Sequence, residues 1–273
     1  MSNLFDIRDY EYLKDIDFSS LEVIADGKSK TIYALDEEIA IMLYKPHLRS
    51  VTNKREGIIK GTDVYRMYAT MFFMNLMESK KIATQRVNDK ILDINGRLAI
   101  LIKRWKPIPL EWIRRYYAAG SIVRLFPIFV KEGQKFNPPL NKYDAKIDVS
   151  LTGGIDDPTM NESYITGLHI LTKPQFDEAD KMLSKIGDIL NEVYAKAGIK
   201  LVDLKMEFGL LGEKVILIDE LSQDCMRAND IKTGETLTKD AYRQWKTPEE
   251  VLETYKIFLE RMCPDYKSLV IKI

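Results

Sequence analysis

The sequence predicts an α+β fold in which short antiparallel strands come first, followed by a long helix and a charged hairpin. Three observations carry this prediction. Short apolar runs separated by turn residues recur before residue 105. The segment 172–194 has apolar residues at helical spacing. The segment 201–227 begins with alternating charged and apolar residues, as a half-buried strand requires.

The composition excludes several classes of function. The chain has 273 residues, of which 41 are basic and 41 acidic. Zero net charge argues against nucleic-acid binding, and two cysteines with two histidines argue against a disulfide framework or a multi-histidine metal site. No apolar run approaches the roughly 20 residues of a membrane span, and the acidic start lacks a signal-peptide pattern. We expect a cytoplasmic protein without a membrane or nucleic-acid partner.

The first part of the chain predicts a β-rich lobe after a peripheral lead-in over residues 1–18. A helix is expected at 64–81, because apolar residues recur there at helical spacing. Pro107 and Pro109 then predict a stiff, extended connector, against whose backbone an adenine could lie. The expected strands are 21–25, 28–35, 38–44, 84–87, 90–93 and 97–104.

A short basic motif, Gly27-Lys28-Ser29-Lys30, joins the first two expected strands. Glycine lets the backbone approach a ligand, and two lysines on one strand face suit phosphate groups. The motif is not a P-loop, because the second glycine and the Lys-Ser/Thr spacing are missing. An ordinary turn is the alternative interpretation.

The middle of the chain predicts a second group of polar side chains. Arg114 and Arg115 offer planar donors suited to phosphate or carboxylate, and Ser121 can cap the helix that follows, although a half-buried strand with a cap explains the pattern equally well. Further elements are a long loop at 133–160, a helix at 172–194, a loop at 231–244 and a last helix at 247–262.

The charged hairpin is the strongest candidate site. Two strands would bring Lys205 close to the carboxylates of Asp203, Glu207, Asp219 and Asp224, an arrangement that suits a magnesium-nucleotide complex. A solvated face on an amphipathic hairpin is the alternative.

The hairpin register decides between these two interpretations. A two- or four-residue loop pairs Glu207 with Ile218, whereas a three-residue loop or a bulge pairs Glu207 with Asp219. We expect the second register, because Gly212 can adopt the positive φ that a three-residue loop needs.

Seven segments, taken together, resemble the SAICAR synthetase (phosphoribosylaminoimidazole-succinocarboxamide synthase) family, and they occur in the order of that family. They are GKSKTIY (27–33), IPLEWIRRYYAAGS (108–121), NPPL (137–140), DDPTMNESYI (156–165), LVDLKMEFG (201–209), IDELSQDCMR (218–227) and TKDAYRQ (238–244). The resemblance implies a two-lobed α+β fold. A kinase-like antiparallel β lobe would span residues 1–106, a larger α+β lobe residues 107–273, and ATP would lie in the cleft.

The resemblance also implies an activity, which is the ATP-dependent joining of an aminoimidazole carboxylate ribotide to L-aspartate. ATP and Mg²⁺ would be the cofactors, the substrates would be small molecules, and the chain would form a homo-oligomer. The implied residues are Lys28, Lys30, Lys103, Glu111, Lys205, Glu207 and Asp219 for ATP, and Glu207 with Asp219 for Mg²⁺. Arg115, Ser121, Asp203, Asp224 and Arg227 would bind substrate, and Asp203, Lys205 and Asp224 would serve catalysis.

The chain departs from the family pattern in four places. The basic segment 50–57 replaces a glycine-rich loop, Tyr116 replaces an asparagine, Gln223 replaces a proline, and the loop 141–156 is expanded. These positions lie where substrates other than ATP are expected, so a ligase using a different amine is an alternative. A small-molecule kinase and a non-catalytic nucleotide-binding protein are two further interpretations, although a His-Arg-Asp signature is absent.

Overall fold

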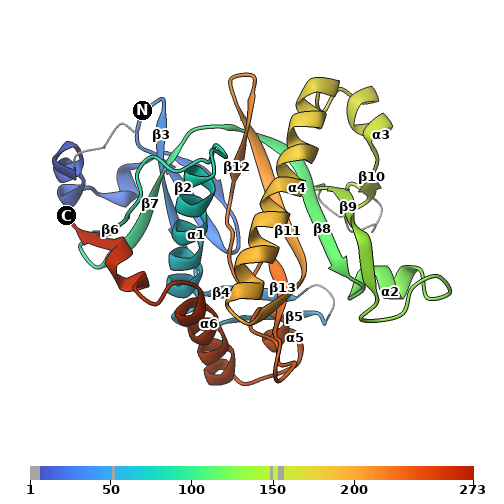
Figure 1. The fold of residues 1–273 in the computed structure, drawn as a ribbon. Helices are drawn as coiled ribbons and strands as arrows, with labels where there is room; N and C mark the ends of the chain where they lie inside the picture. The colour runs from blue at the N-terminus through green and yellow to red at the C-terminus, as the bar shows by residue number, and fades with distance from the viewer. Residues whose placement is uncertain (1–6, 51–52, 148–149, 153–156) are drawn as a thin grey trace. The chain divides into compact units, whose positions relative to one another are not determined.

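The computed structural model describes residues 7–50, 53–147, 150–152 and 157–273, which form two compact units (Figure 1). Unit 1 comprises the chain up to Arg104 together with Leu221–Gln223 and Asp240–Ile273. Unit 2 comprises Trp105–Glu220 and Asp224–Lys239. The α+β class is therefore confirmed. The units divide the chain differently from the expected lobes 1–106 and 107–273, because the last helix packs within unit 1.

Unit 1 contains a six-stranded sheet in the order β1-β2-β3-β7-β6-β14. All neighbours are antiparallel except β14, which runs parallel to β6. The expected strand at 84–87 is reduced to isolated bridge residues, Thr84 and Arg86, of which Arg86 pairs with Ile102. The strands are β1 Val23–Asp26, β2 Lys30–Ala34, β3 Ile39–Tyr44, β6 Ile91–Ile94, β7 Arg97–Lys103 and β14 Val270–Lys272.

Helices complete unit 1. Helix α1 (Thr62–Ser79) packs against this sheet and against α6 (Pro248–Met262), where Phe73 meets Phe258 at a ring-centroid distance of 6.3 Å. This packing is the reason why the C-terminal segment belongs to unit 1. Strands β4 (His47–Ser50) and β5 (Arg55–Ile58) form a separate antiparallel pair that includes part of the basic segment 50–57. The shorter elements are η2 Phe18–Ser20, α5 Asp240–Arg243 and η3 Tyr266–Leu269.

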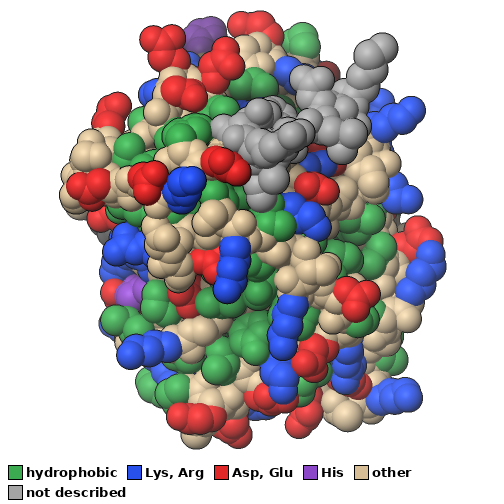
Figure 2. Space-filling model, turned by 90° about the vertical axis from the view of Figure 1, so that its left-hand side faces the viewer, with side chains coloured by type: hydrophobic (Ala, Val, Ile, Leu, Met, Phe, Trp, Pro, Cys, Tyr) green, Lys and Arg blue, Asp and Glu red, His purple; other side chains and the backbone are tan. Residues whose placement is uncertain are grey.

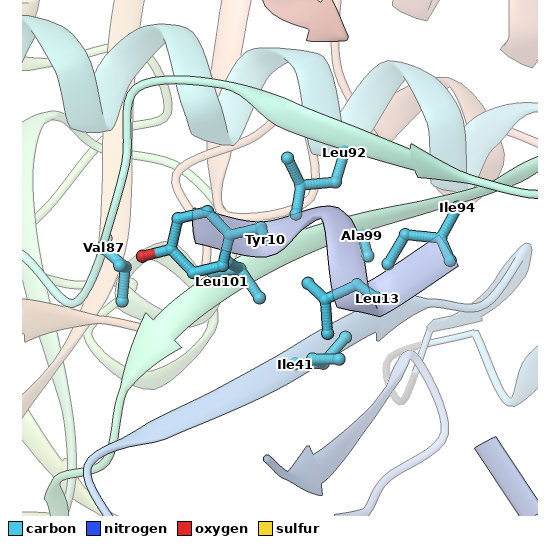
Figure 3. Close-up of a cluster of buried hydrophobic side chains, with 8 residues drawn as sticks. All are labelled: Tyr10, Leu13, Ile41, Val87, Leu92, Ile94, Ala99 and Leu101. Atoms are coloured by element: carbon cyan, nitrogen blue, oxygen red, sulfur yellow. The ribbon is translucent and has the colours of Figure 1, made fainter. Parts of the chain in front are cut away.

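The N-terminal segment is part of the core of unit 1, and the expectation of a peripheral lead-in is wrong for its described residues. A 3-10 helix, η1 (Ile7–Asp15), buries Tyr10 and Leu13 against the sheet (Figure 3). Their spacing of three residues puts both side chains on one face of this helix. The cluster that receives them contains Ile41, Val87, Leu92, Ile94, Ala99 and Leu101.

Unit 2 contains a second sheet in the order β10-β9-β8-β11-β12, with β13 also paired to β11. Strand β8 begins at Lys106, so the expected stiff connector is instead the start of a long strand that tolerates two prolines. The strands are β8 Lys106–Tyr117, β9 Lys135–Ala145, β10 Thr159–Met160, β11 Ile199–Leu211, β12 Lys214–Ile218 and β13 Met226–Asp230.

One long helix covers one face of this sheet. Helix α4 (Lys173–Lys196) packs on β11, β8 and β12 (Figure 1) and begins at the Thr172 capping box. The short helices α2 (Ser121–Leu125) and α3 (Glu162–Gly167) lie outside this layer. Because α4 buries one face, the charged residues of β11 are left on the other.

The surface agrees with the composition. Figure 2 shows acidic and basic side chains interspersed over the face that it presents, as a formal net charge of +0 leads one to expect. Within the described residues, none of the helices is both long and apolar enough to cross a membrane.

The buried position of Leu13 yields a stability prediction. Leu13→Ala should destabilise the protein by about 2–5 kcal/mol, because it empties a fully buried site in the unit 1 core. Tyr12→Ala is the matched control, since Tyr12 is 55% exposed and its loss should change the urea midpoint little. Equal midpoints for the two variants would show that η1 does not contribute to the core.

Candidate functional site

Strand β11 carries the site because its two faces differ in chemistry. Met206 and Phe208 are buried on the side covered by α4, where the Phe208 ring lies 5.4 Å from that of Trp112. Asp203, Lys205 and Glu207 alternate with these residues and make polar contacts on the other side. The alternation seen in the sequence therefore places apolar side chains on the face of β11 that α4 covers and charged side chains on the opposite face.

Lys205 is the centre of a charge cluster. Its Nζ lies 2.6 Å from Glu111 Oε1 and 3.3 Å from Glu207 Oε1. Glu111 and Glu207 are directly opposite each other on β8 and β11, a pairing that would be repulsive without the lysine. Burial lowers the pKa of Lys205, but Glu207 and Glu111 raise it more, so the pKa lies well above its usual value and the ammonium stays charged.

A second cluster lies earlier on β11. Asp203 is the cross-strand partner of Arg115 on β8 and of Arg227 on β13. Arg227 Nη1 donates to Asp203 Oδ2 at 2.8 Å, and Arg115 Nε lies 3.3 Å from the same oxygen. Among the described residues, the buried Arg115 Nε makes no hydrogen bond, because its N–H is poorly aligned with that oxygen. Two guanidinium groups share one carboxylate, which leaves a local excess of positive charge.

The electrostatics of Arg115 agree with this excess. Burial lowers the pKa of Arg115, Asp203 raises it in part, and the nearby charge of Arg227 lowers it again. An anion placed beside both arginines would relieve this repulsion.

The glycine of the Ala-Ala-Gly-Ser motif (118–121) is needed because Gly120 lies directly against Arg227. It has φ +66°, and a Cβ at this position would lie 2.6 Å from Arg227 Nη2. The absence of a side chain therefore lets the Arg227 guanidinium lie against the backbone. Ser121 is the first residue of α2, and the helix N-cap is Gly120, so the expected capping role of Ser121 is wrong.

The hairpin register differs from the prediction. A two-residue loop pairs Leu211 with Lys214 and Glu207 with Ile218, so Asp219 is not the strand partner of Glu207. The three-residue loop is not used, because Gly212 reaches its positive φ of 61° inside the shorter turn.

Asp219 reaches the cluster in another way. The chain leaves β12 at Asp219 with φ 62°, a left-handed conformation that re-aims its side chain. The charge of Asp219 adds to those that raise the pKa of Lys205. The expected pairing of Glu207 with Asp219 through a three-residue loop or a bulge is therefore wrong, and their shared role at a metal ion stays a prediction.

The other predicted residues of unit 2 have defined partners. The buried Asp224 carboxylate lies 3.0 Å from Lys239 Nζ. The backbone carbonyl of Pro109 accepts a hydrogen bond from the Lys146 N–H at 2.9 Å. This carbonyl belongs to the segment expected to contact adenine, and it is already hydrogen-bonded within the protein.

Of the predicted lysines of unit 1, Lys30 and Lys103 lie on the sheet, and Lys28 lies in the turn between β1 and β2. Lys28 Nζ is 2.9 Å from both carboxylate oxygens of Glu56 on β5. Lys30 Nζ lies 5.5 Å from the ring centroid of Tyr44, and Lys103 Nζ donates to the Thr84 carbonyl at 3.2 Å. The exposed ammonium of Lys28 remains accessible to an anion that competes with Glu56.

Arg114 serves the fold. Its guanidinium donates to Ser184 at 3.0 Å and to Asp188 at 2.9 Å on α4. Tyr116 bonds to the same Asp188, so this departure from the family pattern lies on the helix-facing side of β8. Gly187 makes room, since a Cβ there would collide with Arg114.

Sequence reasoning missed Lys146, whose Nζ lies 2.7 Å from Glu207 Oε2. The alternation of Lys142 and Asp144 on β9 with Lys146 directly after it was the signal that could have found it, but it falls inside a segment expected to be loop.

Magnesium is compatible with the donor set. Among the described residues, no group of three or more His, Cys, Asp or Glu side chains is arranged to hold a metal. Two carboxylates, Glu207 and Asp219, act on the same lysine, and Mg²⁺ commonly takes one or two protein carboxylates together with substrate phosphates.

Comparisons with known proteins show the family to which the chain belongs. The model of the SAICAR synthetase family matches residues 23–261. The phosphoribosylaminoimidazole-succinocarboxamide synthase of Sulfurisphaera tokodaii is 30% identical over 88% of this chain and 97% of its own length. The enzyme of that name from Methanoregula boonei is 32% identical over 92% of this chain and 93% of its own.

Solved structures give the same result. That of phosphoribosylaminoimidazole-succinocarboxamide synthase from Ehrlichia chaffeensis has a TM-score of 0.79 and 31% identity, covering 88% of this chain and 98% of that one. A SAICAR synthetase in complex with ADP has a TM-score of 0.79 and 27% identity, covering 89% and 98%. The expected family is confirmed, and the chain belongs to the SAICAR synthetase family.

Proposed function

We propose that this chain is an ATP-dependent ligase of purine biosynthesis. It would join the carboxylate of 5-amino-1-(5-phosphoribosyl)imidazole-4-carboxylate to the amine of L-aspartate. The proposal rests on two neighbouring charge clusters along β11. Asp203 is paired with arginine, and directly after it Lys205 is paired with Glu111 and Glu207. The names of the relatives and the ADP complex of one similar structure support it.

The arginine cluster suits the phosphate of the ribotide. The guanidinium groups of Arg115 and Arg227 both flank Asp203 and offer planar donors beside each other. Ser121 follows Gly120, at which Arg227 is held, and adds a hydroxyl. Asp203 orients both guanidinium groups, and Asp224 with its partner Lys239 would contact the imidazole end of the substrate.

The lysine cluster suits phosphoryl transfer. A carboxylate oxygen of the ribotide would attack the γ-phosphorus of ATP, and ADP would leave with the electrons of the broken P–O bond. The amine of aspartate would then attack the acyl carbon, lose a proton and expel inorganic phosphate. Lys205 would neutralise charge on the transferred group, Lys28 and Lys30 would contact the ATP phosphates, and Lys103 would bind elsewhere on the nucleotide.

Mg²⁺ held by Glu207 and Asp219 would neutralise the phosphate oxygens of ATP. Glu111 keeps Lys205 in place through its 2.6 Å ion pair, so we assign it a positioning role toward the nucleotide. We also propose that the chain forms a homo-oligomer, as the family resemblance implies.

One assay tests the activity. The protein is incubated with ATP, Mg²⁺, the ribotide and a panel of amines, and both ADP and the amide product are followed. We expect ADP only when ribotide and aspartate are both present. ADP together with a different amine would identify another ligase of the family, and sustained ADP formation without any amine would indicate a kinase.

The metal assignment yields a second prediction. Glu207→Gln and Asp219→Asn should each lower ADP formation by about 100-fold or more, because each removes an anionic ligand while keeping the side-chain volume. Glu213→Gln is the control, since Glu213 is exposed in the turn of the same hairpin. Circular dichroism checks the fold, and unchanged turnover in either site variant would remove that residue from the metal site.

The close approach at Gly120 yields a third prediction. Gly120→Ala should raise the KM for the ribotide by about ten-fold or more, the loss expected for one charge-assisted hydrogen bond, because the Cβ displaces Arg227. The KM for ATP should change little.

Gly133→Ala provides the control for backbone strain. Gly133 also has a positive φ, of +77°, but a Cβ at this position would meet no atom within 4 Å. An equal rise in KM in both variants would mean that strain, and not the displacement of Arg227, is responsible.

A further inference from the structure

Each carboxylate oxygen of Glu207 contacts a different lysine. Lys205 Nζ lies 3.3 Å from Oε1, and Lys146 Nζ lies 2.7 Å from Oε2. The Glu207 side chain is 9% exposed, so its charge needs these partners. A metal ion that binds this carboxylate would therefore be repelled by the nearby ammonium of at least one of the two lysines.

The two lysines differ in how easily they can leave. The Lys205 side chain is 31% exposed and holds Glu111 as well as Glu207, so moving it would break two ion pairs. The Lys146 side chain is 53% exposed and contacts Glu207 at the edge of the cluster. The Lys146 ammonium can rotate into solvent, where it stays hydrated. Glu207, by contrast, needs a counter-charge, because a buried carboxylate without one is costly.

The backbone of Lys146 is fixed although its side chain is exposed. Its N–H donates to the Pro109 carbonyl at 2.9 Å, at the point where β9 ends beside β8. The ammonium can therefore withdraw and return without movement of the strand.

We propose that Lys146 is an exchangeable counter-cation for Glu207, which Mg²⁺ replaces at Oε2 when the metal-nucleotide complex binds. This inference rests on the proposed function, because it takes Glu207 as a metal ligand. Lys146 is a positioning residue in this role. It keeps the Glu207 carboxylate compensated and correctly oriented when the metal is absent, and Lys205 retains Oε1 throughout.

The nearby Lys142 provides a contrast. It lies on β9 and pairs with Asp144 at 2.6 Å, and Asp144 also accepts a hydrogen bond from Thr159 at 3.0 Å. Because the ammonium of Lys142 is held by Asp144, Lys142 should not compete with a metal ion at Glu207.

The test measures binding of Mn²⁺, which prefers the same oxygen ligands, to the full-length protein saturated with ADP. Electron paramagnetic resonance reports the free Mn²⁺. Lys146→Met removes the competing ammonium and should tighten Mn²⁺ binding about two- to five-fold, the range expected for a partly exposed ion pair. Lys142→Met should leave the Mn²⁺ affinity unchanged.

Thermal stability gives a second readout. Without metal, Lys146→Met should have a lower Tm than the unsubstituted protein, because Glu207 loses a counter-charge. Added Mn²⁺ should raise the Tm of Lys146→Met more than that of the unsubstituted protein. An unchanged or weaker Mn²⁺ affinity in Lys146→Met would overturn the inference.

Glu207→Gln separates this inference from the proposed function. If Glu207→Gln binds Mn²⁺ as tightly as the unsubstituted protein, Glu207 is not a ligand, and the metal assignment and this inference both fail. If Glu207→Gln weakens binding while Lys146→Met leaves it unchanged, only the inference fails.

Discussion

The compensation of buried charges across neighbouring strands is the constraint on which the site in unit 2 depends. Asp203, Lys205 and Glu207 occupy one face of β11, and the carboxylates of Asp203 and Glu207 are buried, so each needs a counter-charge. Partners come from β8, from β13 and from Lys146 directly after β9, so each strand must keep its register for the charges to meet. The pairing of β8 with β11 thus determines both the fold of this sheet and the positions of the proposed catalytic groups.

Much of this arrangement could be predicted from the sequence, because it depends on local pattern. The alternation in 201–209 indicated which side chains of β11 share a face, and the capping boxes at Thr172 and Thr247 fixed the starts of two helices. The charged and glycine-containing motifs also indicated the family. Such signals lie within a few residues of each other, where period and turn chemistry act directly.

The features that sequence did not predict depend on distant contacts or on single backbone angles. The hairpin register was wrong because a two-residue loop can form at Gly212, and the left-handed conformation of Asp219 has no sequence signature. Lys146 was missed because its partner lies 61 residues along the chain. The burial of Leu13 depends likewise on strands much later in the sequence.

Lys205 and Glu111 stabilise each other across the pairing of β11 with β8. A double-mutant cycle on unfolding free energy, with Lys205→Met, Glu111→Gln and the double variant, tests it most directly. Each single substitution leaves a charge without its partner, so the double variant should be less destabilised than the sum of the two, by about 1 kcal/mol or more. Strict additivity would contradict the account, because it would mean that the two charges are compensated independently.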